Sequence, residues 1–170
     1  MQNELVHLKL QLTFYNIDVM KILVVSDTHR NVSLLKDLYY QNAACDYFLH
    51  LGDSELPEYL MNDYSTVKGN CDYADFPKVK DIEIDGLKIH MEHGDGFKFQ
   101  MNPTKYIEDL NCDIFLFGHT HKKLANKVKN TYIFNPGSLT RPRDGSKGSY
   151  LILTLENKKL VKYEFKEIDL

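Results

Sequence analysis

The chain of 170 residues has the length of one domain, and its 43% hydrophobic and 26% charged residues are typical of a globular protein, which excludes fibrous and disordered classes. Its formal net charge of −3 argues against nucleic acid as a partner, because broad electrostatic binding to nucleic acid needs a clustered basic face.

The cysteines and the apolar segments indicate where the protein works. Cys45, Cys71 and Cys112 form no C-x-x-C pair, so we predict neither a disulfide framework nor a zinc knuckle, and we expect a reducing compartment. No stretch approaches the roughly 20 apolar residues that cross a bilayer, and no signal peptide is recognisable. We therefore expect a cytoplasmic protein without a membrane partner.

The first residues are interpreted as an extension. Residues 8–14 alternate apolar and polar side chains, which is typical of a half-buried edge strand. They precede residues 20–27, which resemble the opening strand of an α/β domain. We therefore divide the chain into an extension at residues 1–19 and a single domain at residues 20–170.

From residue 20 onward, apolar runs alternate first with helical segments and later with turns. We predict strands at residues 22–25, 47–51, 65–68 and 114–117, and helices at residues 33–41, 56–62 and 102–110. Hairpins are predicted at residues 82–89, 127–134 and 150–165. Asp85-Gly86 suits a type I′ turn, and Asn102-Pro103 is typical of a helix start. This order favours sheets packed together with helices outside.

Polar residues that carry chemistry follow five of the apolar runs. They are Asp27 and His29 after the first strand, Asp53 after the second, Asn70, Cys71 and Asp72 after the third, His93 and Asp95 after residues 87–91, and His119 and His121 after residues 114–117. Ligands of open α/β sheets bind just beyond the carboxyl ends of strands, so these clusters are expected to converge on one crevice.

Taken singly, most of these clusters have an ordinary structural interpretation. Asp27 and Asp53 suit turns and helix caps, where Asp is common. The two imidazoles of His119 and His121 after an apolar strand are more specific, because they are costly to place without a purpose. The joint order and strand-end placement of all five clusters favour a metal site.

With Asn135-Pro-Gly-Ser138 after it, the series Asp-x-His, Gly-Asp, Gly-Asn, His-Gly and Gly-His-x-His resembles the calcineurin-like metallophosphoesterases, specifically the small bacterial and archaeal phosphodiesterase branch. The likeness spans residue 20 to about residue 155. It implies an α/β (α+β) fold, a four-layer α-β-β-α sandwich of two mixed sheets packed face to face. Helices are expected outside and the metal site at the carboxyl ends of the strands.

The resemblance also implies two divalent metal ions with Asp, Asn and His ligands. One ion would be held by Asp27, His29 and His121, the other by Asn70, His93 and His119, and Asp53 would bridge them. Mixed nitrogen and oxygen ligands suit Mn, Fe, Co, Ni or Zn better than Ca or Mg, and the family implies manganese. A hydroxide between the metals would attack a phosphate ester, so no protein nucleophile is needed.

Asn70, besides its place among the ligands, and three further residues are expected to act at the reaction site: Asp72, Cys71 and Arg30. Many relatives have histidine in place of Cys71, and a neutral thiol replaces that imidazole poorly, so we expect a preference for esters with acidic leaving groups. Arg30 either contacts a phosphate oxygen or is a solvated side chain. Asp72 is expected to orient a metal ligand, as carboxylates often do with imidazoles.

The predicted function is that of a phosphodiesterase acting on a small-molecule phosphate ester. Alternatives are a phosphomonoesterase or nucleotide pyrophosphohydrolase using the same ions, or a non-catalytic scaffold like the small subunit of the retromer coat, a relative that has lost ligands. All seven expected ligands are present here, which speaks against a scaffold. The sequence does not determine the oligomeric state, and a homo-oligomer is one of the alternatives. Arg141 and Arg143, in a Gly/Pro loop, either reach substrate or are solvated.

Overall fold

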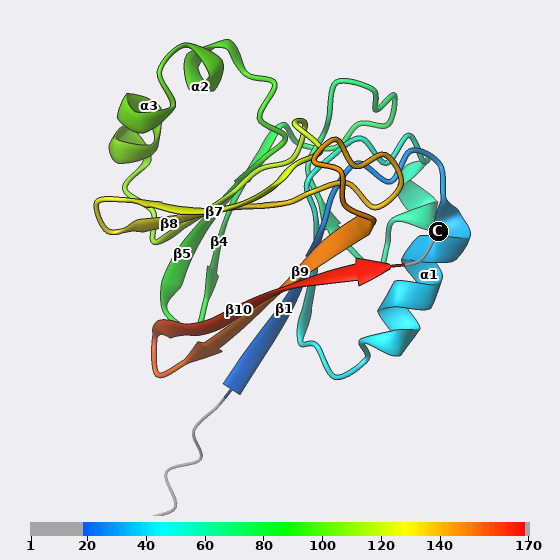
Figure 1. The fold of residues 1–170 in the computed structure, drawn as a ribbon, viewed down its shortest axis with the longest axis horizontal. Helices are drawn as coiled ribbons and strands as arrows, with labels where there is room; N and C mark the ends of the chain where they lie inside the picture. Colours follow the sequence, from blue (N-terminus) through cyan, green and yellow to red (C-terminus); the bar gives the residue numbers. More distant parts are fainter. Residues whose placement is uncertain (1–18, 169–170) are drawn as a thin grey trace, which may run out of the picture.

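Two five-stranded mixed sheets face each other in the computed structural model, which describes residues 19–168 (Figure 1). The first sheet has the order β10-β9-β1-β2-β3 and the second β4-β5-β6-β8-β7. In the first sheet, β1, β2 and β3 are parallel and the antiparallel β9–β10 hairpin lies at the opposite edge. In the second sheet, β5, β6 and β8 are parallel at the centre and antiparallel hairpins form both edges. The sheets that the resemblance implies are therefore confirmed.

The strands of the first sheet are β1 (Val19–Val25), β2 (Tyr47–His50), β3 (Ser65–Thr66), β9 (Gly148–Glu156) and β10 (Lys159–Ile168). Those of the second sheet are β4 (Val79–Ile84), β5 (Leu87–Glu92), β6 (Ile114–Leu116), β7 (Lys123–Val128) and β8 (Thr131–Pro136). Strands β1 and β2 are parallel, as are β5 and β6, so in each pair the carboxyl ends of both strands lie at the same end of the sheet.

The central strands bury side chains on both of their faces. In β1, Ile22 and Val24 point into the core between the sheets, whereas Leu23 and Val25 pack in a second cluster with the helix α1 (Val32–Gln41). This explains why the strand is continuously apolar instead of alternating, as is typical of strands covered on both faces.

Helices cover the outer face of each sheet, which completes the four layers (Figure 1). On the second sheet the cover consists of α2 (Phe97–Met101) and α3 (Pro103–Leu110). Phe99 of α2 and Ile107 of α3 pack against Phe115 of β6. The side chain of Asn102 accepts a hydrogen bond from the amide of Lys105, which confirms the predicted helix start.

Several predicted elements need correction. The helix predicted at residues 56–62 is only a 3₁₀ turn, Glu58–Leu60, and the helix α2 was not predicted. The hairpin predicted at residues 127–134 is longer, because the polar strand β7 begins at Lys123. The sequence did not indicate the start of β7, because most of its side chains are exposed and an edge strand need not be apolar.

The turn of the predicted β4–β5 hairpin is as expected, with φ of 47° at Asp85 and 70° at Gly86. Residues 1–18, with the possible strand at residues 8–14, lie outside the described residues, so the division into an extension and one domain stays a prediction. Within residues 19–168, the structure has no helix long and apolar enough to cross a membrane.

Candidate metal centre

The loops after β1, β2, β5 and β6 meet at one end of the sandwich. Two backbone hydrogen bonds join the first two loops, from the amide of Asp27 to Gly52 O at 3.0 Å and from that of His29 to Asp53 O at 3.1 Å. The amide of His119, from the second sheet, donates to Asp27 Oδ2 at 3.2 Å. The loops from both sheets are therefore fixed to one another at this point.

Five of the predicted ligands form two compact groups at this junction. Potential ligand atoms lie within 4.8 Å of one another in the group Asp27, His29 and His121, and likewise in the group Asp27, Asp53 and His93. The Nε2 atom of His121 lies 3.0 Å from Asp27 Oδ1, and that of His93 lies 3.4 Å from Asp53 Oδ2. The carboxylate common to both groups is Asp27, whereas the family resemblance implied that Asp53 would be shared.

The other two predicted ligands, Asn70 and His119, lie at the margin of these groups. Asn70 Oδ1 lies 3.0 Å from Nδ1 of His119, so the two side chains contact one another. The ring of His119 lies 5.2 Å, between centroids, from that of His93. Asn70 is exposed and His119 half-buried, so both face the solvent side of the cluster.

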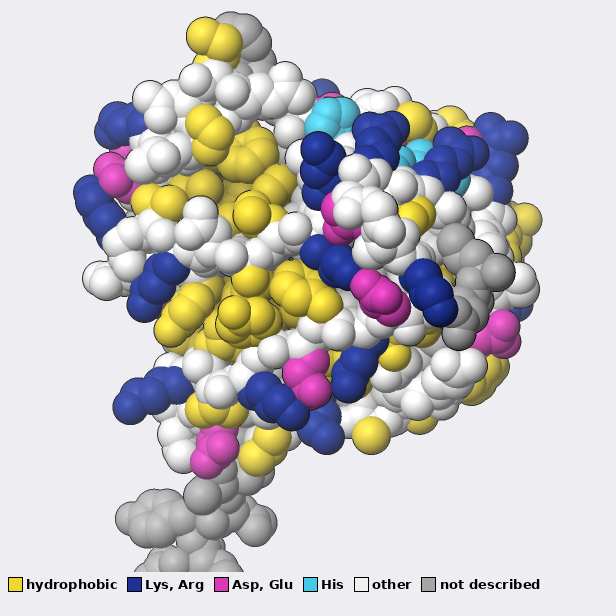
Figure 2. All heavy atoms as spheres, viewed as in Figure 1, with side chains coloured by type: hydrophobic (Ala, Val, Ile, Leu, Met, Phe, Trp, Pro, Cys, Tyr) yellow, Lys and Arg dark blue, Asp and Glu magenta, His cyan; other side chains and the backbone are white. Residues whose placement is uncertain are grey.

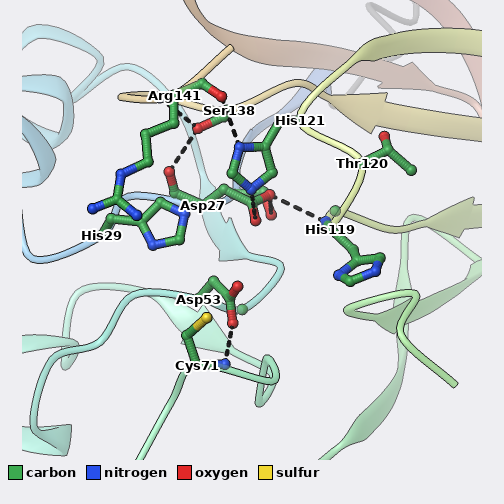
Figure 3. A network of polar contacts seen from close by, with 12 residues as sticks. Asp27, His29, Asp53, Cys71, His119, Thr120, His121, Ser138 and Arg141 are labelled. Atoms are coloured by element: carbon green, nitrogen blue, oxygen red, sulfur yellow. Dashed lines mark hydrogen bonds and ion pairs between the residues drawn. The ribbon is translucent and has the colours of Figure 1, made fainter. Parts of the chain in front are cut away.

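Three imidazoles are oriented by the same kind of hydrogen bond. Each uses Nδ1 for a hydrogen bond of 2.7 Å to a fixed oxygen: His29 to Glu55 Oε1, His93 to Leu51 O and His121 to Arg141 O. A neutral ring that donates through Nδ1 keeps the lone pair on Nε2 free for a metal. Figure 3 shows His29 and His121 together with Asp27 at the centre.

The inner atoms of this cluster lack hydrogen-bond partners. Asp27 Oδ1, His29 Nε2 and His93 Nε2 are buried without a hydrogen bond of regular geometry to any residue in 19–168, and the first and third have only the ion-pair contacts given above. Unpaired buried polar atoms are costly, and three of them around one point need an explanation. Divalent cations with mixed nitrogen and oxygen ligands satisfy all three, so the residues present fit a metal site.

Electrostatics at the cluster favour positive charge. Burial alone would lower the pKa of His93, but the contacts with Asp53 and Asp27 outweigh it and raise the pKa to about 9. The contact with Asp27 likewise raises the pKa of His121. Burial opposes ionisation of Asp53, yet His93 and Cys71 hold the pKa of this carboxyl well below its usual value. The buried carboxylates thus attract either protons or metal ions.

The backbone at the ligands is unusual. Asp27, Asp53, His119 and His121 have φ values of 53°, 54°, 64° and 59°, in the left-handed region that residues other than glycine seldom occupy. Such conformations cluster at functional sites, where the surrounding structure enforces them. Here they turn successive side chains toward the cluster within very short loops.

Two glycines allow the backbone to approach the ligands closely. A Cβ atom at Gly69 would lie 2.1 Å from Asp53 Oδ1, and one at Gly118 would lie 2.0 Å from Ser26 Oγ. Both positions therefore exclude any side chain. The glycines of the motifs are required by the packing of the loops around the carboxylates.

Asp72 lies behind the cluster and organises its loops. Its carboxylate accepts four hydrogen bonds, from the amides of Asp53, Glu55 and Gly69 and from the hydroxyl of Ser54. The predicted contact with an imidazole is not made within residues 19–168. Asp72 instead positions the ligand Asp53 through the backbone, because the sharp turn after β2 exposes amides that need an acceptor.

Glu55 is a residue that the sequence analysis missed. Its Oε1 holds His29 and its Oε2 lies 2.7 Å from Nε of Arg30, so one carboxylate joins both side chains. These contacts, with His29 contributing most, hold the pKa of Glu55 below its usual value. Two roles were considered for Arg30, a contact with a phosphate oxygen and a solvated side chain. In the structure its guanidinium group instead forms an ion pair with Glu55. No signal in the adjoining sequence marks Glu55, because its partner His29 lies on another loop.

Cys71 and the Asn135-Pro-Gly-Ser138 segment border the centre. The amide of Cys71 donates to Asp53 Oδ1 at 2.7 Å, and burial together with Asp53 raises the pKa of its thiol to about 11. Asn135 Nδ2 donates to Gly118 O at 2.6 Å, and Ser138 Oγ donates to Asp27 O at 2.8 Å. This segment therefore supports the backbone of ligands from both sheets.

Comparisons with known proteins agree with this geometry. The family model of the calcineurin-like phosphoesterase superfamily domain matches residues 20–158. The probable metallophosphoesterase YsnB of Bacillus subtilis is 36% identical over 145 residues, which cover 81% of this chain and 86% of YsnB. Phosphodiesterase YfcE of Escherichia coli is 26% identical over 167 residues, covering 79% of this chain and 88% of YfcE.

A solved structure gives the same result. A protein of Streptococcus pneumoniae, described as a predicted phosphoesterase, superposes with a TM-score of 0.79 at 27% identity. The match covers 88% of this chain and 90% of the other. The likeness in fold therefore extends over both sheets.

Proposed function

Because the chain belongs to the calcineurin-like phosphoesterase superfamily, we propose that it is a phosphodiesterase that holds two divalent cations at the junction of its sheets. Membership makes it a metal-dependent phosphoesterase. The diester specificity, the number of cations and the roles of individual residues are the proposal. Its main support is the set of buried, inward-facing atoms of Asp27, His29 and His93 that have no hydrogen-bond partner within residues 19–168.

The ligand assignment follows from which atoms are free. Asp27 Oδ2 accepts hydrogen bonds from Ser26 Oγ and the amide of His119, so Oδ1 is left for the cation shared with His29 and His121. We assign the second cation to Asn70, His93 and His119. Asp53, whose Oδ2 faces His93, is assigned to this cation, and we keep for it the shared role that the family resemblance implies, although Asp27 is the carboxylate common to both groups. Manganese suits this donor set and is the ion we expect.

Bound cations would polarise the phosphoryl group and activate a water molecule for attack in line with the leaving oxygen, so no protein nucleophile is needed. The chain's own residues supply orientation. Glu55 and the carbonyls of Leu51 and Arg141 fix the imidazoles, while Asp72 fixes the loop of Asp53. To Asn70, exposed at the margin, we assign the donation of an amide hydrogen to a phosphate oxygen, beside the one its Nδ2 donates to Cys71 Sγ at 3.2 Å.

The leaving group receives little help from Cys71. With its pKa raised to about 11, the thiol is neutral at pH 7 and a weak hydrogen-bond donor. The rate at which the leaving group departs from phosphorus therefore depends on the acidity of that group itself. This supports a preference for activated esters, such as aryl diesters and nucleotide anhydrides, over alkyl diesters.

The likeness to phosphodiesterase YfcE supports a diesterase over a phosphomonoesterase. A nucleotide pyrophosphohydrolase remains the second candidate, because the exposed Arg141 and Arg143 lie on the loop that holds His121. A scaffold without catalysis is disfavoured, since all seven predicted ligands are present and five of them form the buried groups.

The decisive experiment combines metal analysis with hydrolysis. Purified wild type and Asp53→Asn are measured by elemental analysis and by release of 4-nitrophenol from bis(4-nitrophenyl) phosphate with added manganese. Asp37→Asn, an exposed carboxylate on α1, is the matched control. We expect Asp53→Asn to lose bound metal and at least about 100-fold in rate while the control keeps both. Equal metal content and rate in all three proteins would refute the proposal.

A further inference from the structure

The loop at residues 137–143 is bonded directly to the metal centre. Ser138 Oγ donates to Asp27 O at 2.8 Å and accepts the amide of Arg141 at 2.9 Å. Arg141 O accepts Nδ1 of His121 at 2.7 Å, and the amide of Arg143 donates to His121 O at 2.9 Å. The backbones of both arginines are therefore bonded to one predicted ligand, His121, and Ser138 links the loop to a second, Asp27.

Their guanidinium groups have no such partners. Arg141 and Arg143 are exposed, and neither forms an ion pair with a carboxylate in residues 19–168. Arg30, by contrast, is paired with Glu55. In Figure 3 the side chain of Arg141 extends from its loop in the direction of His29.

The carboxylate nearest in sequence is already occupied. Asp144 accepts the amide of Lys123 at 3.0 Å and the amide of Ser146 at 3.1 Å. Burial opposes ionisation of Asp144, but the hydroxyl of Ser146 and these two amides lower its pKa to about 2, so the carboxylate is engaged within its own loop. The two guanidinium groups are thus left available to an external anion.

The surroundings add positive charge on a chain whose net charge is −3. Lys122, next to His121, is also exposed. In Figure 2, Lys and Arg side chains surround the visible histidine atoms at the edge of the molecule. A local cationic rim on an acidic protein attracts anions to one place and leaves the remaining surface repulsive.

We propose that Arg141 and Arg143 form a second anion subsite beside the metal centre, so that the preferred substrate is a phosphodiester or anhydride with a further phosphate group. Guanidinium groups match the geometry of phosphate oxygens and stay charged at all working pH values. The subsite rests on the proposed function, because the metal centre must hold the scissile phosphate while the arginines hold the second.

The test uses two substrates that differ in one phosphate: thymidine 5′-(4-nitrophenyl phosphate) and the same compound with a 3′-phosphate. Both are assayed with the manganese-loaded wild type, Arg141→Gln, Arg143→Gln and the double variant. Lys36→Gln/Lys159→Gln, which removes two exposed charges from α1 and β10, controls for net charge. Calorimetric binding of thymidine 3′,5′-bisphosphate and thymidine 5′-monophosphate to the same proteins gives a readout independent of turnover.

We expect kcat/KM for the 3′-phosphorylated ester to fall roughly tenfold more than that for the plain ester in each single arginine variant, as loss of one charge-assisted contact predicts. The affinity for the bisphosphate should fall by the same factor, and Arg143→Lys should restore part of it. The lysine control should leave the ratio between the two ligands unchanged.

Three results would overturn the subsite. One is an equal fall for both esters, which would place the arginines on the scissile phosphate. Another is a ratio that is the same in wild type and double variant. The third is an equal change in the lysine control. If wild type hydrolyses neither ester, the proposed function fails, and the binding of the bisphosphate then decides the subsite alone.

Discussion

The Nδ1 atom of His29 lies 2.7 Å from Oε1 of Glu55, a residue that follows the neighbouring strand in the sheet. The same carboxylate contacts Arg30. Glu55 therefore fixes the ring plane and the tautomer of one predicted ligand from a second loop.

We expect Glu55→Ala to weaken metal binding about 10- to 100-fold, the usual cost of removing a carboxylate that holds a liganding histidine. Glu55→Gln should lie between Ala and wild type, because its amide oxygen still accepts the hydrogen bond but carries no charge. Competition with a fluorescent metal chelator measures the affinity. Glu83→Ala, an exposed carboxylate of β4, is the control, and equal affinities in all proteins would contradict the assigned role.

Gly69→Ala should disrupt the centre through steric contact. The new Cβ atom would lie 2.1 Å from Asp53 Oδ1, so the carboxylate or the loop must move. We expect a loss of about 1–3 kcal/mol in the free energy of unfolding, together with loss of bound metal. Gly96→Ala is the matched control, since its Cβ would meet nothing within 4 Å, and a similar loss in both variants would rule out the explanation.

Asp72→Asn should destabilise the loop after β2. The carboxylate accepts four hydrogen bonds, whereas the amide nitrogen of Asn would face donors and leave some of them unpaired. We expect about 2–4 kcal/mol of lost stability in urea unfolding, since several charged hydrogen bonds are affected. Asp75→Asn, an exposed neighbour, should change stability by less than about 0.5 kcal/mol. If the two variants are equally stable, Asp72 does not organise the loop.

His50 should make the metal-free protein sensitive to acid. Burial outweighs the nearby carboxylates Asp72 and Asp27 and lowers the pKa of His50 to about 4 from its usual 6.5. Its neutral ring contacts Thr28 Oγ1 at 2.6 Å. Below pH 6.5 the unfolded chain binds a proton here and the folded chain does not, so the stabilisation present above pH 6.5 declines until pH 4.

The size of this effect is about 3 kcal/mol over that window. Chemical unfolding of the chelator-treated protein between pH 4 and 7 should therefore show a shallower pH dependence for His50→Gln than for wild type. The comparison isolates His50 together with the buried groups that interact with it, because groups elsewhere titrate equally in both proteins. Parallel curves would mean that the pKa of His50 is the same in the folded and unfolded states.

Cys71→His should widen the range of leaving groups. An imidazole titrates near pH 6.5 and donates a proton far more readily than a thiol whose pKa is raised to about 11. We expect the wild-type rate to fall steeply with increasing leaving-group pKa across aryl phosphodiesters and the variant rate to fall less steeply. Cys45→Ser, away from the centre, should keep the wild-type slope. Identical slopes for Cys71→His and wild type would remove Cys71 from leaving-group chemistry.

The framework of the site could be predicted because strand ends are visible in the sequence. Runs such as residues 22–25 and 114–117 are apolar on both faces, and the polar residues directly after them mark the edge of the sheet. Asp27, His29, Asp53, His93 and His121 were predicted for this reason, and the structure brings them together. The prediction rests on the order of the polar clusters along the chain. Ordinary turn residues would not occur in this order after successive strands.

What escaped prediction depends on contacts between distant loops. Glu55 contacts His29 only because the turns after β1 and β2 run side by side, and nothing in its own neighbourhood marks that contact. The role of Asp72 required knowing which amides the turn after β2 leaves unpaired. Short helices such as α2 depend on burial of Phe99 against the sheet, which local sequence does not reveal.

The centre takes Asp27 and Asp53 from one sheet and His93 and His121 from the other. A cation bound there would link the two sheets, so the melting temperature must rise with metal occupancy. Binding at 100 times the dissociation constant adds about 2.7 kcal/mol. Chelation therefore loosens the whole architecture as well as stopping turnover, and a thermal shift assay can rank candidate metals before any substrate is known.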